Sequence, residues 1–377
     1  MRKLLFLGLI PALWCSIENP TTIKDRLNSA SYTTNVFSRK LGRDLERISR
    51  PQFFKEHLGS QILTIGCLPI TTSFTLAAFP IRTLLSAASA VIPAPELKLV
   101  QSPSKKGQPA NQLTLLSFNA CLREGFVAPY TAGVVPPSEA VEGHSSRSDA
   151  IANWIVTQSP DIFLGQEFND PAAVEIIMRE MKQNGYTAFI YDPHLNPFSI
   201  NCGLFIASKR TLADVELISF PFKHKGGIAK FARRGTITCT VLDDIGQPLL
   251  RIYNTHLDAG PIQDVRNSQL KNYILPSFSN ETIPSVLIGD LNFDTAQFGQ
   301  ESGLDAYVNI LEGQVTCNDE GKLTLRGMSP PANREKIDAI IANIKAIRFT
   351  NIQNTQVKAG QDILSDHHGV GATINLQ

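Results

Sequence analysis

Polar side chains that can do acid–base and metal chemistry follow several apolar runs of this sequence. At five places an apolar run stops abruptly at Asn, Gln, Asp, Glu or His. Among the residues at these places are Asn119, Gln166 and Glu167, Asn254 and His256, Asp290 and Asn292, and Asp366 and His367. Functional side chains gather beyond strand ends because a rigid sheet aims them. One such place alone is commonly a turn or a helix cap, whereas five with the same chemistry indicate a single site.

The side chains at these places favour a hard divalent cation. They offer oxygen ligands without a Cys/His cluster, which suits Mg²⁺ or Mn²⁺ better than zinc. The six cysteines are scattered and form no CxxC pair. Glu167 is the natural metal ligand. The set predicts metal-assisted attack of water on a phosphate ester.

Two further pairs of residues could handle the substrate and the proton. Asp290 and Asn292 are two positions apart, so on an extended segment they would face the same side and could hold an attacking water and a phosphoryl oxygen. His256 and His367 could donate to the reacting groups or take a proton from them.

Alternating apolar and polar segments predict the elements that carry these residues. Strands are expected near residues 113–119, 161–167, 187–191, 202–208, 236–242, 249–256, 285–290, 336–344 and 369–375. Helices are expected near residues 146–158, 172–182 and 261–273. This pattern indicates an α/β or α+β fold, with two sheets packed as a sandwich and helices outside.

The ordered series of motifs resembles the endonuclease/exonuclease/phosphatase superfamily. It comprises Asn119, Gln-Glu at 166–167, Asn-Thr-His-Leu at 254–257, Gly-Asp-Leu-Asn-Phe-Asp at 289–294, and Ser-Asp-His-His at 365–368. Lys-Ile-Asp-Ala-Ile at 336–340 resembles the Asp-bearing strand before the family's final Ser-Asp-His. The resemblance spans roughly residues 113–377. It implies a four-layer αββα sandwich of two packed mixed sheets, with the site at one end.

The resemblance also implies a metal site and a substrate contact. Glu167 would ligate Mg²⁺ or Mn²⁺, Asn119 would assist at the metal or the phosphate, and Asp366 would be a further metal or site carboxylate.

The catalytic roles come from the same resemblance. His256 and Asn292 would contact the phosphate. Asp290 would position or activate the nucleophile, or protonate the leaving group. His367 would act as general base, oriented by Asp338, while His368 is better explained as a neighbouring or surface histidine.

Charge divides the chain of 377 residues into two parts. With 43% hydrophobic and 18% charged residues, the composition excludes a disordered or fibrous protein. Residues 1–110 hold 14 Lys and Arg against 6 Asp and Glu, whereas residues 111–377 hold 21 against 28. We expect an N-terminal membrane-associating region over residues 1–110 and a catalytic domain over residues 111–377.

The N-terminal part predicts a membrane-associated or secreted protein. Residues 1–16 resemble a signal peptide or a short uncleaved anchor, and both alternatives stay open. Residues 61–81 carry no charge and are long enough to span a bilayer, and a second apolar run covers residues 83–92. Because Pro69 and Pro80 would break a helix, a pair of short helices is the alternative to a span. Residues 93–112 form a linker.

Three features favour a lipid substrate of the neutral-sphingomyelinase-like phospholipase C branch. The segment at 123–147 after Asn119 is long, as in that branch. Residues 231–235 resemble the segment where those lipases carry Lys-Gly, which makes Arg234 a candidate phosphate contact. The acidic body lacks the basic face of a nuclease, and a basic apolar head suits a membrane surface.

Three alternatives remain from the sequence. Basic residues at 223–234 would also suit a nuclease of the DNase or AP-endonuclease kind, although nucleic acid is the less favoured partner. An inositol-phosphate phosphatase belongs to the same superfamily. A catalytically inactive binding module is disfavoured because the site residues are all present.

Overall fold

The computed structural model describes most of the chain from residue 97 onward. The described residues are 97–102, 112–122, 137–193, 201–221, 224–225, 233–259, 262–293, 302–304, 307–311, 314–318, 334–343 and 347–376. They belong to one compact unit that comprises residues 96–193 and 200–377. The signal-like segment, the two apolar runs and most of the linker lie outside the described residues, as do residues 123–136.

The first sheet contains β2, β3 and β15, three strands that carry expected site residues. In the described residues it runs in the order β1-β4-β5-β3-β2-β15-β11-β12, and β14 also pairs with β15. Its strands are β1 (Lys98–Gln101), β2 (Gln112–Leu122), β3 (Ile162–Phe168), β4 (Ala188–Tyr191), β5 (Phe205–Ser208), β11 (Cys317–Asn318), β12 (Arg334–Glu335), β14 (Arg348–Ala359) and β15 (Asp362–Asn375). The β2–β3 pair is parallel, while β15 runs antiparallel to β2.

The second sheet is also mixed and carries the remaining site strands. Its order is β10-β13-β9-β8-β7-β6. Its strands are β6 (Leu212–Ser219), β7 (Gly235–Leu242), β8 (Pro248–His256), β9 (Ser285–Asp290), β10 (Val308–Asn309) and β13 (Asp338–Ala342). Strands β7 and β8 form an antiparallel hairpin around residues 243–247.

The two helices that pack on the first sheet begin at side-chain caps. Ser146 accepts a hydrogen bond from the Asp149 amide at the start of α6 (Arg147–Gln158). Asp170 caps α7 (Pro171–Gln183) in the same way. On the other side, α8 (Gln263–Gln269) continues through a π-helical turn (Leu270–Ile274) into α9 (Leu275–Phe278), so the expected single helix at 261–273 is divided.

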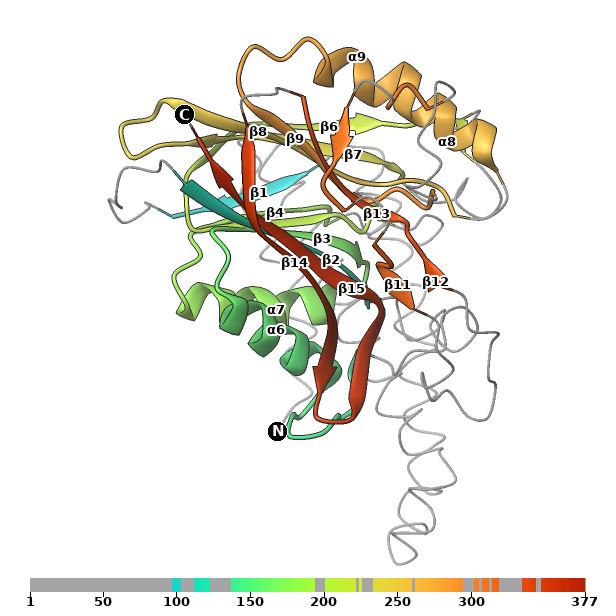
Figure 1. Ribbon diagram of the computed structural model, residues 1–377. Coiled ribbons are helices and arrows are strands. Elements are labelled where there is room, and N and C mark those ends of the chain that lie inside the picture. Colours follow the sequence, from blue (N-terminus) through green and yellow to red (C-terminus); the bar gives the residue numbers. More distant parts are fainter. Residues whose placement is uncertain are drawn as a thin grey trace, which may run out of the picture. The chain divides into compact units, whose positions relative to one another are not determined.

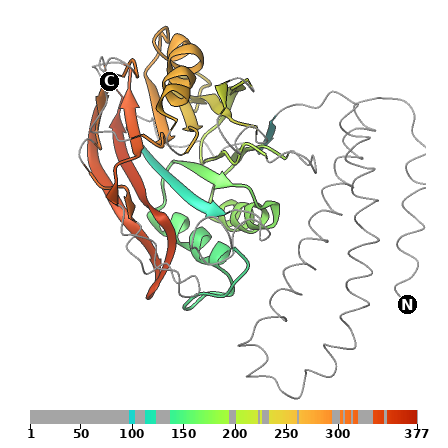
Figure 2. The same ribbon diagram turned by 90° about the vertical axis from the view of Figure 1, so that its right-hand side faces the viewer.

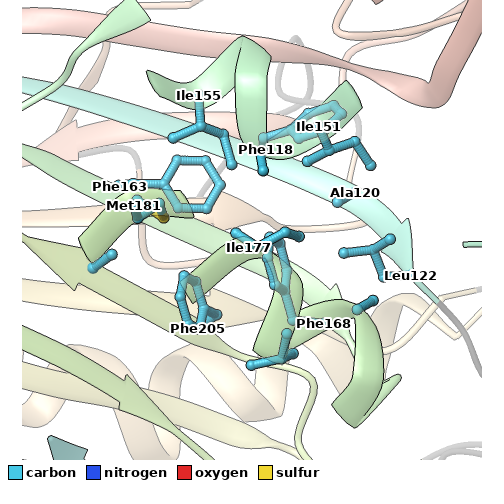
Figure 3. Close-up of a cluster of buried hydrophobic side chains, with 14 of the residues drawn as sticks. Phe118, Ala120, Leu122, Ile151, Ile155, Phe163, Phe168, Ile177, Met181 and Phe205 are labelled. Atoms are coloured by element: carbon cyan, nitrogen blue, oxygen red, sulfur yellow. The ribbon is translucent and has the colours of Figure 1, made fainter. Parts of the chain in front are cut away.

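Three clusters of buried apolar side chains pack the four layers against one another. One cluster packs α6 and α7 onto the first sheet and contains Phe118, Ile151, Phe163 and Ile177 (Figure 3). A second cluster fills the space between the sheets, and a third lies beneath α8 and α9. Figures 1 and 2 show the resulting helix–sheet–sheet–helix order. The expected αββα sandwich of two mixed sheets is therefore confirmed.

The sequence pattern missed several strands, of which β14 is the longest, and it placed the start of the last strand too late. The long strand β14 pairs with β15 in the hairpin at the left of Figure 2, and the sequence pattern did not predict β14. Because Gln356 pairs with His368 and Lys358 with Ile363, the last strand begins at Asp362, not near residue 369. Residues 365–368 therefore lie within a strand and do not precede one.

None of the helices in the described ranges combines the length and the apolar character that crossing a membrane requires.

Candidate active site

The strand register places three site residues side by side at one end of three adjacent strands of the second sheet. Asp290, the last residue of β9, is paired with His256 in β8 and with Asp338 in β13. All three are buried. Paired residues on adjacent strands share a face, so this row of side chains follows directly from the sheet.

Asn119 joins that row to the first sheet. Its side-chain Nδ2 donates to Asp290 Oδ2 at 2.9 Å and lies 3.3 Å from His367 Nε2. Its Oδ1 accepts a hydrogen bond from the Cys121 amide at 3.1 Å. The side-chain nitrogen of Asn119 thus faces the site, while its side-chain oxygen is occupied by the backbone amide of Cys121. Metal ligation through that oxygen would require the amide to turn.

Asp290 lies at the centre of the cluster. Its Oδ2 is 3.5 Å from His256 Nε2 and 3.6 Å from His367 Nε2. Its Oδ1 accepts a hydrogen bond from the Asn292 amide at 2.8 Å. One carboxylate thus contacts both histidines that the sequence singled out.

His367 is fixed by the second sheet. Its Nδ1 lies 3.0 Å from Asp338 Oδ2, so the carboxylate orients the ring as expected. Thr316 holds Asp338 in turn, since its Oγ1 accepts from the Asp338 amide at 3.0 Å. Such a carboxylate–imidazole pair fixes the tautomer and leaves Nε2 toward Asp290 and Asn119.

Burial and charge shift the pKa values of this cluster. Burial raises the pKa of Asp290 to about 7, although the charge of His367 opposes the change. Burial would lower the pKa of His367, but Asp338, Cys317 and Asp290 together raise it well above its ordinary value. Proton exchange near neutral pH is therefore a property of the Asp290–His367 pair.

Asn292 departs from the expected geometry. The chain does not stay extended after Asp290, because Asn292 adopts a left-handed conformation with φ 50°. Its Nδ2 donates to the Leu257 carbonyl at 3.0 Å. The expectation that Asp290 and Asn292 face the same side of an extended segment is wrong, since the Asn292 amide turns back onto the Asp290 carboxylate.

Glu167 lies near the end of β3, where its neighbour Gln166 pairs with Asn119. Glu167 is only 6% exposed, and its φ of 57° is unusual for a glutamate. Arg147 lies within electrostatic range of both Glu167 and Asp366. Such a strained, buried carboxylate is a feature of functional sites.

The donor set fits a hard divalent ion. The carboxylates of Glu167, Asp290 and Asp366 would offer oxygen ligands to such an ion. In the described residues, two groups of three possible ligands have ligand atoms within 4.8 Å of one another, namely Asp290 with Asp338 and His367, and Asp366 with Cys317 and His367. Glu167 belongs to neither group.

Arg234 lies at the start of β7, beside the His256 end of β8. Its Nε is 3.7 Å from Asp258 Oδ1, and Asp258 is fully buried. Arg233 pairs with Asp192 at 2.9 Å. The predicted phosphate contact Arg234 is thus at the rim of the site and already faces a carboxylate.

His368 points away from the catalytic cluster. Its Nδ1 lies 2.8 Å from Asn354 Oδ1 on the neighbouring strand β14. Adjacent residues of a strand face opposite sides, which separates His368 from His367.

Sequence reasoning missed three residues that shape the site. Arg147 is buried beneath the strand ends, Thr316 holds Asp338, and Cys317 pairs in register with His367. Burial raises the pKa of the Cys317 thiol to about 11, so it is not a nucleophile at neutral pH. A lone Arg at the first position of an otherwise apolar helix face was the only available signal for Arg147.

The αββα sandwich carries this polar cluster at one end of its two sheets. The family model described as "Endonuclease/Exonuclease/phosphatase family" matches residues 117–367. The chain belongs to this family.

Solved structures share the fold at low sequence identity. D. rerio TDP2 complexed with a single-strand DNA product superposes with a TM-score of 0.51 and 19% identity over 70% of this chain and 99% of that chain. SmcL gives 0.50 and 17% over 70% and 99%. Beta toxin from Staphylococcus aureus gives 0.51 and 16% over 69% and 99%. A search of curated proteins by sequence finds no match.

Proposed function

We propose that this chain is a phosphodiesterase of the sphingomyelinase or phospholipase C type that acts on a lipid headgroup at a membrane surface. The proposal includes a membrane-associating N-terminal region followed by a catalytic domain. The catalytic domain extends before the expected boundary at residue 111, because β1 (Lys98–Gln101) pairs with β4. The observation that carries the proposal is the charge balance at the rim of the site.

The described cations at the rim face carboxylates. Arg233 pairs with Asp192 and Arg234 with Asp258, and both aspartates are buried. Lys225 is also within electrostatic range of Asp258. Polyanion binding requires an excess of positive charge along a groove. The three cations Lys225, Arg233 and Arg234 share the two carboxylates Asp192 and Asp258, which leaves a charge of about +1 at this part of the rim. One excess positive charge suits a single phosphodiester better than a polyanion.

The residues of the cluster have complementary roles in hydrolysis. The Asp290–His367 pair holds one proton near neutral pH, because the pKa of His367 is raised well above its ordinary value, and it takes a second proton from the attacking water, because the pKa of Asp290 is about 7 and the two groups are in contact. Asp338 keeps the His367 ring oriented. His256 and Asn119 lie beside Asp290, where they would donate hydrogen bonds to the phosphoryl oxygens of the substrate. The expectation that His367 alone is the base is thereby extended to the pair.

Glu167 and Asp366 would hold Mg²⁺ or Mn²⁺, with Asn119 as a further candidate ligand. A bound divalent ion supplies charge stabilisation at the phosphoryl oxygens. The side chain of Asn292 donates to the Leu257 carbonyl, and its backbone N–H donates to the Asp290 carboxylate and keeps that carboxylate in place.

Nuclease activity is the second candidate. The fold is shared with a TDP2 structure that contains a single-strand DNA product, and Lys225, Arg233 and Arg234 gather near one another at the rim. These cations would have to exchange their carboxylate partners for DNA phosphates.

A substrate panel separates the candidates. The full chain with Mg²⁺ would be incubated with sphingomyelin and phosphatidylcholine vesicles, single-stranded DNA and inositol phosphates. We expect release of the phosphorylated headgroup from the vesicles, abolished by excess chelator. Faster cleavage of DNA would overturn the lipid assignment, and release of inorganic phosphate from inositol phosphates would identify the phosphatase alternative. No turnover with any substrate would support the inactive binding module.

A further inference from the structure

Arg147 is among the largest fully buried side chains of the described residues. It is the first residue of α6, and its guanidinium donates three hydrogen bonds to backbone carbonyls. Nη1 reaches Ala120 O at 2.8 Å and Leu364 O at 2.5 Å, and Nη2 reaches Cys121 O at 2.7 Å. Its acceptors therefore lie on two different strands, β2 and β15.

Both strands carry site residues next to these carbonyls. Ala120 and Cys121 follow Asn119, and Leu364 precedes the segment that contains Asp366 and His367. The β2–β15 register runs from Gln112 opposite Asn375 to Ser117 opposite Val370. Arg147 bonds the two strands beyond that stretch, on the side of the site.

The β2 strand is irregular where Arg147 binds it. The β2–β3 register shifts between Asn119 and Leu122, and Cys121 has a left-handed φ of 48°. A bulge of this kind re-aims side chains and turns carbonyls out of the ladder. Here the Cys121 amide turns onto Asn119 Oδ1, which sets the orientation of the Asn119 side chain.

The Ser365 hydroxyl makes a parallel tie between the same segments. It donates to the Asn119 carbonyl at 2.6 Å and accepts from the His367 amide at 3.2 Å. The Ser365 hydroxyl thus connects the backbone of Asn119 to that of His367, and the Arg147 guanidinium ties the neighbouring residues Ala120, Cys121 and Leu364 together.

Three carboxylates also lie within electrostatic range of the buried guanidinium of Arg147. Glu167, Asp366 and Asp170 act on its charge. Burying a guanidinium costs more than burying an apolar side chain of similar size. Since α6 could pack through an apolar residue at this position, packing alone does not account for Arg147.

We infer that Arg147 is a positioning residue that clamps the β2 bulge to β15 and so holds Asn119 and His367 in their catalytic arrangement around Asp290. The inference rests on the proposed phosphoester hydrolysis for its kinetic readout.

Two substitutions and a matched control test the clamp kinetically. Arg147→Met removes all three bonds, and we expect kcat to fall about 10²-fold with KM within about threefold, since small displacements of catalytic groups cost this much. Arg147→Lys keeps the charge and part of the hydrogen bonding, so its kcat should lie between that of the wild type and that of Arg147→Met. Arg251 is the control, because it also donates three bonds, to Asp214 O, Thr240 Oγ1 and Thr238 Oγ1. It lies five residues before the His256 end of β8, about 17 Å away. Arg251→Met should lower Tm and leave kcat within about threefold.

A double-mutant cycle separates positioning from general stabilisation. If Arg147 acts through Asn119, then Arg147→Met should reduce kcat much less in an Asn119→Ala background than in the wild type. An equal factor in both backgrounds would overturn the inference, as would a kcat of Arg147→Met near that of the wild type. Should Arg147→Met fail to fold, the same cycle is run with Arg147→Lys.

Amide hydrogen exchange provides a readout that needs no substrate. The Cys121 and His367 amides should exchange at least tenfold faster in Arg147→Lys than in Arg251→Lys, relative to wild type. Equal protection in the two variants would overturn the clamp. If the wild-type chain hydrolyses none of the substrates, the proposed function fails, and exchange at these amides still decides whether Arg147 ties the strands.

Discussion

At the scale of single residues, Asp290 carries a proton that the unfolded chain would release. Burial raises its pKa from 3.8 to about 7, so the folded protein binds this proton between about pH 4 and 7 and the unfolded chain does not. Stability from this group is therefore complete below about pH 4 and is lost as pH rises toward 7. The site keeps a carboxylate that is costly to ionise because its ionised form accepts a proton near neutral pH.

Replacing Asp290 with Asn tests this trade. We expect Asp290→Asn to lose about 10²–10⁴-fold in rate and to gain at least about 2 °C in Tm at pH 8, with a smaller gain at pH 5. Thermal unfolding with chelator present at both pH values measures the gain. An equal Tm difference at pH 5 and pH 8 would contradict the raised pKa.

The wild-type rate should fall as pH decreases through about 7, because Asp290 becomes protonated and cannot accept a proton. A profile of kcat against pH between 5 and 9 measures this limb. A rate that stays constant down to pH 5 would exclude Asp290 from proton transfer.

The two adjacent histidines should differ sharply. His367 contacts Asp290 and Asp338, so His367→Ala should reduce the rate by about 10²–10⁴-fold. His368 contacts Asn354 on the other face of β15, and His368→Ala should change the rate by less than about tenfold. Steady-state kinetics of the two variants decide the assignment, which is wrong if His368→Ala is the inactive one.

Glu167 should control metal dependence. Glu167→Gln keeps the size of the side chain and removes its charge, so we expect hydrolysis to be lost while the Tm in chelator changes little. Calorimetric titration with Mg²⁺ should show weaker binding than in the wild type. Full turnover of the wild type in excess chelator would refute the metal requirement.

At the scale of elements, the approach of β9 to β8 depends on Gly289. Its φ is +136°, and a Cβ atom there would overlap the Thr255 carbonyl oxygen. Thr255 is the register partner of Gly289, one pair before His256 and Asp290. The row of site residues therefore requires a glycine at this position.

Gly289→Ala should lower the free energy of unfolding by about 2–4 kcal/mol. Gly246→Ala is the matched control, because Gly246 also has a positive φ of +87° but no atom within 4 Å of an added Cβ. The control should cost about 1 kcal/mol. Urea unfolding compares the two, and equal losses would show that contact with β8 is unimportant.

At the scale of the whole molecule, charge separates the chain into a basic N-terminal part and an acidic remainder. The excess of Lys and Arg over residues 1–110 would attract an anionic bilayer, while the apolar runs at 61–81 and 83–92 would bury in it. The acidic remainder would be repelled by polyanions and by anionic lipid alike.

Membrane attachment should follow from that part of the chain. We expect the full chain to sediment with membranes after lysis at low salt and to stay there at high salt, since apolar insertion is not screened. Fractionation and immunoblotting measure the distribution. Recovery of the full chain in the soluble fraction at low salt would contradict the membrane proposal.

Local pattern in the sequence was enough for much of the catalytic unit. Apolar runs of strand length predicted most of the strands, because each buried strand must present a continuous apolar surface. The ordered polar residues at their ends indicated Asn119, Glu167, His256, Asp290 and His367. Side-chain chemistry alone was enough to favour an oxygen-ligand metal site.

Tertiary structure decided how those residues meet. The hydrogen bond between Asn119 and Asp290 joins positions 171 residues apart, and it depends on which sheet edges pack together. The turn at Asn292 depends on the carbonyl of Leu257, the residue that follows β8. That carbonyl lies far from Asn292 in the sequence. The contacts of Arg147 also depend on tertiary structure, since its buried guanidinium donates to three carbonyls from two strands. Periodicity reports which face of an element is buried, whereas long-range contacts arise only when the elements are packed.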